Sequence, residues 1–220
     1  MSSRPSDADA HAEGTSDPPL GAAPDLLRPG LRLVFCGYNP SLTSGASGHH
    51  YAHPVNRFWR LLAEAGITPR RYAPQEDADL LDLGIGFTNI VARPTRRADE
   101  LTKDEIRAGA ATLREKFGEL QPRIVAYCGV GVYQWYTGRR KIAWGIQPEP
   151  ALPGIIDVVV PSPSGLNRMT LDEMLTHYRT VADLLHSIPA DAPYPLDNTT
   201  PGAIDAGRCA GASKDASSRR

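Results

Sequence analysis

LRLVFCGYNPSL, residues 31–42, decides the fold: a short apolar run passes through a glycine into a polar turn. Three further runs are equally short and rich in β-branched residues, and each is closed by glycine, Arg-Pro or proline: FTNIV (87–91), RIVAYCG (123–129) and IIDVVVP (155–161). Runs of this length and composition are typical of strands buried on both faces.

Amphipathic segments separate these runs and carry helix start signals. Thr102 with Glu105 and Thr170 with Glu173 both fit the capping-box pattern, and Asn56 is expected to cap a third helix that starts near residue 58. Strands that alternate with helices predict a mostly parallel sheet with helices on both faces. The predicted fold class is α/β, a three-layer α/β/α sandwich with a central, mostly parallel β-sheet.

The ends of the chain differ in composition from its centre. Residues 1–27 and 189–220 are rich in Pro, Ala, Ser and Asp and poor in large apolar residues, so we expect two disordered tails around a single domain at 28–188. The whole chain has a net charge of -1, which by itself argues against a partner as acidic as DNA. The first tail holds one Arg and five acids, however, and the predicted domain has a net charge of +3.

The three cysteines, Cys36, Cys128 and Cys209, are widely spaced and fit neither a disulfide framework nor a four-cysteine metal site. The first residues lack the apolar core of a signal peptide, and no run is long enough to span a membrane. We therefore expect a soluble protein of the reducing cytoplasm.

Three loops follow the predicted strands, at 37–56, 92–100 and 161–169, and ligands of such sheets bind beyond the carboxyl ends of the strands. The first loop spans about twenty residues without a predicted strand or helix, which is typical of a functional loop. It contains His49, His50 and His53, but adjacent histidines on an extended loop point apart and no carboxylate or cysteine stands at ligand spacing. We predict no metal site.

Leu166 is a bulky apolar residue in the otherwise polar loop PSPSGLNR (161–168). Two interpretations stay open from the residues alone: the side chain packs into the protein's own core, or it is a wedge inserted between stacked bases, followed by a polar residue and an arginine for phosphate.

Four blocks resemble the mismatch-specific uracil/thymine DNA glycosylase family: GYNPSL (37–42), GHHYAHPVNRFW (48–59), GIGFTNIVARPT (84–95) and PSPSGLNR (161–168). They stand in that family's order and spacing, and the resemblance covers about residues 30–188. It implies a monofunctional DNA glycosylase that hydrolyses the N-glycosidic bond of uracil, or of thymine or a modified pyrimidine, opposite guanine. This reaction starts base excision repair.

The resemblance also implies roles for individual residues. Asn39 takes the catalytic position; a carboxamide is no general base at neutral pH, so its expected role is to orient a water. Tyr51 is expected to stack on the flipped base, with anchoring of its own loop as the structural alternative. Tyr38 is expected to line the pocket with backbone N–H groups nearby, and Asn89 and Thr95 to contact the base.

In the last block the resemblance makes Leu166 the wedge. Gly165 and Asn167 would offer backbone groups to the widowed guanine, and Arg168 would reach a phosphate. Two residues depart from the family pattern: Ala92 stands where relatives often have an acid, and Ser162 where some have Asn. The first departure puts the rate of hydrolysis in doubt.

The expected partner is double-stranded DNA with a G·U or G·T mispair, bound by a monomer without a cofactor. Three alternatives remain: a mismatch- or damage-binding module of the same fold with weak or no activity, an enzyme of free nucleosides, and a dinucleotide-binding domain. The turn GYNPS lacks the glycine fingerprint of the third. We expect a DNA-facing edge that gathers the motif cations: His49, His50, His53, Arg57, Arg93, Arg96, Arg97 and Arg168.

Overall fold

The central element is a five-stranded sheet in the order β2-β1-β3-β5-β4, seen in a computed structural model that describes residues 21–189. The first four strands in this order are parallel, and the last pairs antiparallel with β5. The strands are β1 (Leu33–Gly37), β2 (Ile85–Asn89), β3 (Ile124–Cys128), β4 (Gly145–Ile146) and β5 (Ile156–Val160). The predicted α/β/α sandwich with a mostly parallel sheet is confirmed.

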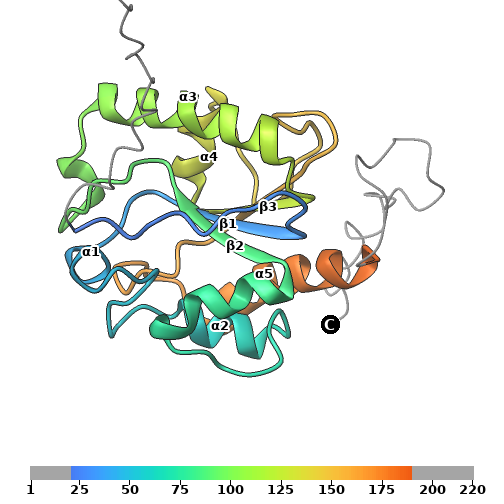
Figure 1. The fold of residues 1–220 in the computed structure, drawn as a ribbon. Coiled ribbons are helices and arrows are strands. Elements are labelled where there is room, and N and C mark those ends of the chain that lie inside the picture. Colours follow the sequence, from blue (N-terminus) through green and yellow to red (C-terminus); the bar gives the residue numbers. More distant parts are fainter. Residues whose placement is uncertain (1–20, 190–220) are drawn as a thin grey trace, which may run out of the picture.

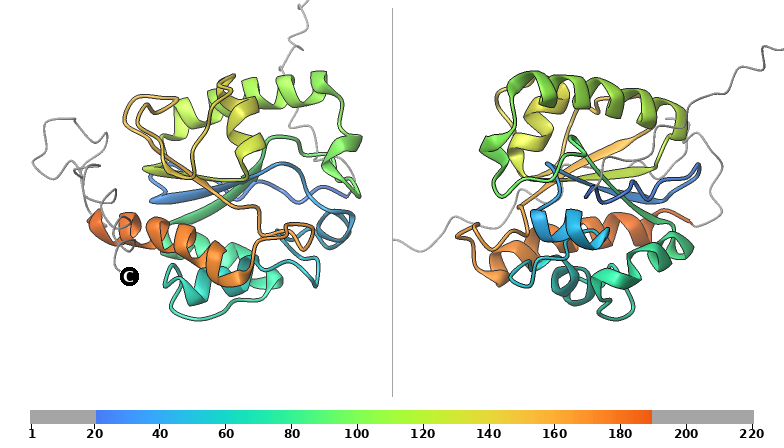
Figure 2. Two further views of the ribbon diagram at one scale, coloured as in Figure 1. Left: turned by 180° about the vertical axis from the view of Figure 1, so that it is seen from behind. Right: turned by 60° about the vertical axis from the view of Figure 1, so that its left-hand side comes forward.

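Helices cover both faces of the sheet (Figure 1). One layer contains α3 (Lys103–Leu120) and α4 (Val130–Thr137), and the other contains α2 (Phe58–Glu64) and α5 (Leu171–Ser187). The two layers stay on opposite faces when the molecule is turned (Figure 2). The remaining helices are α1 (Leu42–Ser47) and the 3-10 segments η1 (Pro74–Leu83) and η2 (Ala98–Glu100).

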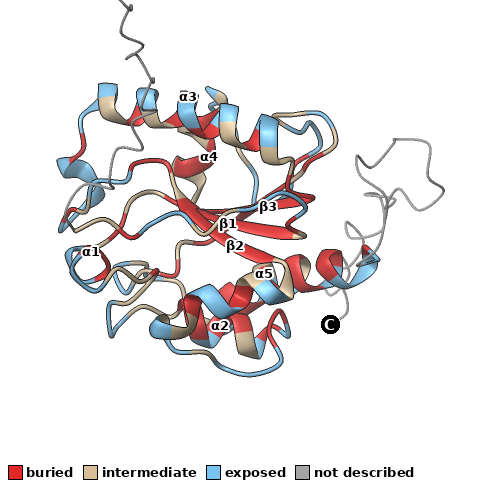
Figure 3. Ribbon diagram, in the orientation of Figure 1, coloured by how far each residue is buried: buried red, intermediate tan, exposed pale blue. Residues whose placement is uncertain are grey.

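The sheet lies between two apolar clusters, which explains its continuous apolar strands. Along β1, Leu33 and Phe35 belong to the cluster under α2 and α5, whereas Val34 and Cys36 belong to the cluster under α3 and α4. All four side chains are completely buried, and Figure 3 shows the strands as the most buried part of the molecule. A strand that alternates between two cores has no polar face.

Both predicted capping boxes are present. The Thr102 hydroxyl accepts a hydrogen bond from the backbone N–H of Glu105, whose carboxylate accepts one from the backbone N–H of Thr102. Thr170 and Glu173 repeat this arrangement at α5. At α2 the capping residue is Arg57 by position, although the expected Asn56 side chain does accept from the Phe58 N–H at 3.0 Å.

The structure differs from the sequence prediction in several elements. The loop at 37–56 contains the short helix α1, which is capped by Ser41, whose hydroxyl accepts a hydrogen bond from the Ser44 N–H. The second strand begins at Ile85, two residues before the predicted start. The edge strand β4 has only two residues and was not predicted, because so short a strand depends on its partner.

The segment 21–27 lies against the domain, although the sequence prediction assigned it to the N-terminal tail. Leu26 exchanges backbone hydrogen bonds with Phe87 of β2, at 2.9 and 3.0 Å. The Asp25 carboxylate accepts from the Thr88 hydroxyl and the Lys116 ammonium, both at 2.7 Å. Ala23 is buried. This N-terminal strap (21–27) therefore moves the boundary predicted at residue 28.

The rest of the predicted tails, 1–20 and 190–220, lies outside the described residues. No helix within residues 21–189 is long and apolar enough to cross a membrane.

Candidate functional site

A pocket of about 230 Å³ lies at the carboxyl ends of β1, β2 and β3, where the fold predicts a ligand site. This volume is below the roughly 300–1,000 Å³ of sites for drug-sized ligands, so the pocket suits a group no larger than a single base. Its walls combine all three predicted loops and include Tyr38, Asn39, Tyr51, Asn89, Thr95 and Leu166.

Asn39 is held in one orientation by its amide nitrogen. The Nδ2 group donates to the Thr95 hydroxyl at 2.7 Å, to the Arg93 carbonyl at 3.0 Å and to the Pro40 carbonyl at 3.3 Å. The Oδ1 atom makes no hydrogen bond with any residue in 21–189. The side chain therefore presents one free acceptor at the pocket.

Thr95 supports this orientation and has no spare hydroxyl proton. Its hydroxyl donates to the Arg97 carbonyl at 2.7 Å while it accepts from Asn39. The side chain is 3% exposed. Thr95 lines the pocket, as expected for a residue near the base, and its hydroxyl is already engaged with Asn39 and Arg97.

Tyr51 forms an aromatic wall of the pocket. One ring face stacks on Phe58, with 3.7 Å between centroids and 14° between planes, and the hydroxyl donates to the Cys128 sulfur at 3.4 Å. Burial raises the pKa of the Tyr51 phenol well above its ordinary value, so the phenol stays neutral. With one ring face covered by protein, only the other is available to a ligand.

Asn89 lies in the pocket because Gly37 has no side chain. A Cβ atom on Gly37 would lie 2.4 Å from the Asn89 Oδ1 and 3.3 Å from the Tyr51 hydroxyl. The glycine that ends β1 therefore lets both polar groups approach the strand end. Tyr38, the next residue, is half-buried and also lines the pocket.

Leu166 is the most exposed large apolar residue of the described chain, at 78%. This excludes the interpretation that it fills the protein's own core. It lies on the pocket rim in the loop between β5 and α5, which we call the wedge loop (161–169).

The neighbours of Leu166 differ in what they can offer a partner. Asn167 already uses both backbone groups, since its N–H donates to the Ser164 carbonyl and its carbonyl accepts from Arg57. Gly165 is exposed, and neither of its backbone groups is bonded within residues 21–189. Arg168 is exposed and makes no hydrogen bond or ion pair with the described residues.

Most of the cations expected at a DNA-facing edge already have partners within the protein. Arg93 pairs with Glu105 at 2.6 Å, and Arg97 pairs with Asp99 at 2.7 Å. Arg57 donates to backbone carbonyls inside the protein. Two exposed arginines of the predicted set, Arg96 and Arg168, remain without a partner in the described chain.

The histidines have structural partners. His49 lies 3.1 Å from the Asp77 carboxylate, which also accepts from the His50 N–H at 2.8 Å. His50 donates from Nε2 to the Pro24 carbonyl at 2.9 Å, and burial lowers its pKa. Within residues 21–189, no group of three His, Cys, Asp or Glu side chains could hold a metal ion.

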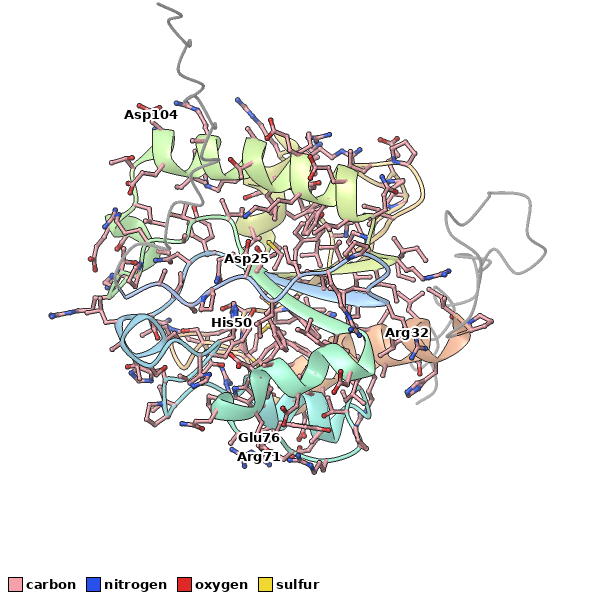
Figure 4. All side chains as sticks on the ribbon, in the orientation of Figure 1. Asp25, Arg32, His50, Arg71, Glu76 and Asp104 are labelled. Carbon is pink, nitrogen blue, oxygen red and sulfur yellow. The ribbon has the colours of Figure 1, made fainter. Side chains whose placement is uncertain are left out.

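Ala23, His50 and Cys128 are among the pocket residues that the sequence did not assign to the site. Ala23 comes from the N-terminal strap, and no motif marks it. Figure 4 shows Asp25 of the strap and His50 near the middle of the molecule, beside the sheet. Cys128 lies at the carboxyl end of a predicted strand, and this position is the signal from which a place in the pocket could have been predicted.

The sequence of the domain matches a family model for the uracil DNA glycosylase superfamily over residues 24–186. The chain belongs to this superfamily. It is therefore a uracil DNA glycosylase by family, a hydrolase of DNA repair whose substrate is DNA.

A structural comparison agrees on the fold of this glycosylase. The solution NMR structure of a "putative Uracil DNA glycosylase from Methanosarcina acetivorans" superposes with a TM-score of 0.51 at 20% sequence identity. The match covers 74% of this chain and 98% of that one. At this identity the likeness concerns the fold of the glycosylase alone.

Proposed function

We propose that this glycosylase removes uracil, and more slowly thymine or modified pyrimidines, from mispairs with guanine in double-stranded DNA. It acts as a monomer, uses water as the nucleophile, and leaves the DNA strand intact. Unstacking a base costs a few kcal/mol in general and costs least for a mispaired base, so G·U and G·T sites enter the pocket most readily.

The free Oδ1 atom of Asn39 is the observation that carries this proposal. Because three acceptors hold the amide nitrogen, Oδ1 is the atom left to accept a hydrogen bond from a water molecule. A fixed acceptor orients that water toward C1′ of a flipped nucleotide while the glycosidic bond breaks. The amide takes no proton at neutral pH, and its contribution is positioning.

The base enters beside Tyr51 and Asn89. The open face of the Tyr51 ring stacks on the pyrimidine, a contact generally worth about 1–3 kcal/mol per base. The Asn89 amide, next to the Tyr51 hydroxyl, has donors and an acceptor for the edge of the base. Their closeness at the end of β1 supports a pocket that reads one pyrimidine.

The exposed Leu166 fills the space that the flipped nucleotide leaves. An apolar side chain inserted between base steps holds the duplex open. The unbonded backbone groups of Gly165 suit the Watson–Crick edge of the widowed guanine, in place of Asn167. Arg168 and Arg96 are available for phosphates on either side.

The pocket walls hold no aspartate or glutamate among the described residues, and Ala92 is exposed and neutral. Without a carboxylate to assist the water, hydrolysis should be slow. This feature also gives the alternative its support: a module that binds mismatched DNA but turns over weakly or not at all.

A duplex panel tests the proposal. Oligonucleotides carrying uracil, thymine or ethenocytosine opposite guanine, and uracil opposite adenine, are incubated with excess enzyme and cleaved with alkali at abasic sites. We expect the fastest single-turnover excision for G·U. Tight binding to G·U without any product would favour the binding module.

Asn39→Ala provides the matched variant. We expect its excision rate to fall by at least about 100-fold, as for loss of a positioned catalytic group. Its affinity for a duplex with an abasic site should be unchanged, which controls for folding. Full activity of Asn39→Ala would refute the role of this residue.

A further inference from the structure

Arg57 connects the start of α2 to the wedge loop through its guanidinium group. Nη1 donates to the Met169 carbonyl at 2.6 Å, and Nη2 donates to the carbonyls of Ser164 and Asn167, both at 2.9 Å. These three carbonyls lie on both sides of Leu166 in the sequence. One side chain therefore fixes the two ends of the segment that presents Leu166.

The Arg57 clamp, which is the guanidinium with its three hydrogen bonds to the wedge loop, is anchored in the core. Arg57 directly precedes Phe58 and Trp59, which are 0% and 4% exposed, and its own backbone N–H donates to the Pro163 carbonyl at 3.0 Å. The guanidinium is thus held at a fixed distance from the sheet. A loop tied to such an anchor keeps its position relative to the pocket.

The wedge loop contains no helix or strand, so its conformation depends on hydrogen bonds to other parts of the protein. Its internal bonds are local: Asn167 Nδ2 donates to the Ser162 carbonyl, and the Leu166 N–H donates to the Ser164 hydroxyl at 3.2 Å. On its other side, Gly165 lies against Val55, where a Cβ atom would come within 2.7 Å of the Val55 Cγ2 atom. The loop is therefore bonded to Arg57 and lies close to Val55.

We propose that Arg57 is a positioning residue that keeps the wedge loop in the conformation required for insertion. Leu166 then enters the duplex without a prior ordering step, and binding is faster and tighter because the cost of ordering is met in the free enzyme. This inference rests on the proposed wedge function of Leu166. It assigns the Arg57 guanidinium to the protein's own wedge loop and not to a phosphate of the DNA.

Arginine suits this role better than lysine. Its planar group offers several N–H donors in a rigid fork, so it binds three carbonyls at once, whereas the lysine ammonium is a compact charge on a flexible stem. Arg57→Lys preserves the charge and removes the fork. If Arg57 bound DNA only through its charge, lysine would largely replace it.

The test compares Arg57→Lys with wild type on three substrates: a G·U duplex, a single strand with uracil, and a duplex with uracil opposite an abasic site. Misplacement by about 1 Å can cost up to about 100-fold, so we expect a 10- to 100-fold loss on the G·U duplex. Activity on the single strand should stay within about twofold of wild type, since no stack must be opened there. The third substrate, which has no paired guanine, should show an intermediate loss.

Arg60→Lys is the matched control, because Arg60 lies on α2 close to Arg57, is exposed, and pairs with no residue of 21–189 except Glu64. We expect no change on any substrate. The double variant Arg57→Lys/Leu166→Ala should lose no more on the duplex than Leu166→Ala alone, because the clamp acts through the wedge. Additive losses would overturn the inference, as would equal losses of Arg57→Lys on duplex and single strand.

Gly165→Ala tests the same loop from its other side if Arg57→Lys fails to fold. The new methyl group meets Val55 and pushes the loop away from its position. We expect the same selective loss on the duplex, with partial recovery in Gly165→Ala/Val55→Ala. A wild-type enzyme inactive on every substrate would refute the proposed function itself, whereas active wild type with unaffected Arg57→Lys would refute only the clamp.

Discussion

Replacing Leu166 with alanine separates the wedge from the rest of the site. Full burial of a leucine side chain is worth about 1.5–3 kcal/mol. Leu166 is 78% exposed in the free protein, so most of this free energy is still to be gained when the side chain enters DNA. Taking 78% of it gives about 1.2–2.3 kcal/mol, or about 7- to 50-fold in the affinity for a G·U duplex.

The same exposure predicts that folding is unaffected. Surface substitutions away from structural contacts usually change stability by less than about 0.5 kcal/mol, so the urea midpoint of Leu166→Ala should match that of wild type. Affinity is measured by titration of a G·U duplex with a non-cleavable uridine analogue, and excision by single-turnover kinetics. A single-stranded uracil substrate is the control, with an expected loss below about twofold. An equal loss on single strand and duplex would refute the wedge, and so would an unchanged duplex affinity.

Thr95→Val removes the hydroxyl that holds the Asn39 amide, and we expect the single-turnover excision rate to fall by up to about 100-fold with duplex affinity unchanged. Arg96→Gln and Arg168→Gln should each make the plot of log binding constant against log salt concentration shallower by about 1, as measured by fluorescence anisotropy. The third prediction concerns Glu105, whose pKa is lowered to about 2 by a neighbouring guanidinium and the helix cap. Because the folded state favours the ionised carboxylate, the contribution of Glu105 to stability is complete above pH 4.5 and is lost as the pH falls toward 2. Urea unfolding should therefore show Glu105→Gln less stable than wild type at pH 7 and similar to it near pH 2.

Each of these predictions has a clear opposing result. Thr95→Val with wild-type rates would mean that Asn39 is oriented by the backbone carbonyls alone. Arg97 serves as the control for the salt experiment, because it is already paired with Asp99 and its loss should change the slope less. A gap between Glu105→Gln and wild type that is the same at pH 2 and pH 7 would contradict the lowered pKa.

The sequence was sufficient for the sheet and the long helices because their signals are local. Four apolar runs predicted the four parallel strands, and two capping boxes predicted the starts of α3 and α5. The position of Leu166 after a glycine in a polar loop left two interpretations open, a core residue or a wedge, and its exposure excludes the first. In the structure it is exposed on the pocket rim.

The sequence was insufficient where distant residues determine the outcome. Helix α1 is six residues long and contains serines and a glycine, so its own propensity is low, and its place in the fold supplies what propensity does not. The pairing of the charges was not predictable for a similar reason: Arg93 meets Glu105, twelve positions away, and Arg57 meets a loop more than one hundred positions away. A count of cations near a motif does not show which are already paired.

The N-terminal strap has a consequence for the solubility of this glycosylase. β2 ends the sheet on one side, and an uncovered edge strand offers its backbone to other chains and promotes aggregation. Leu26 pairs with part of this edge, while on the other side the edge strand β4 is only two residues long. Shortening the chain as far as residue 27 would therefore remove a pocket wall and also free an edge for self-association.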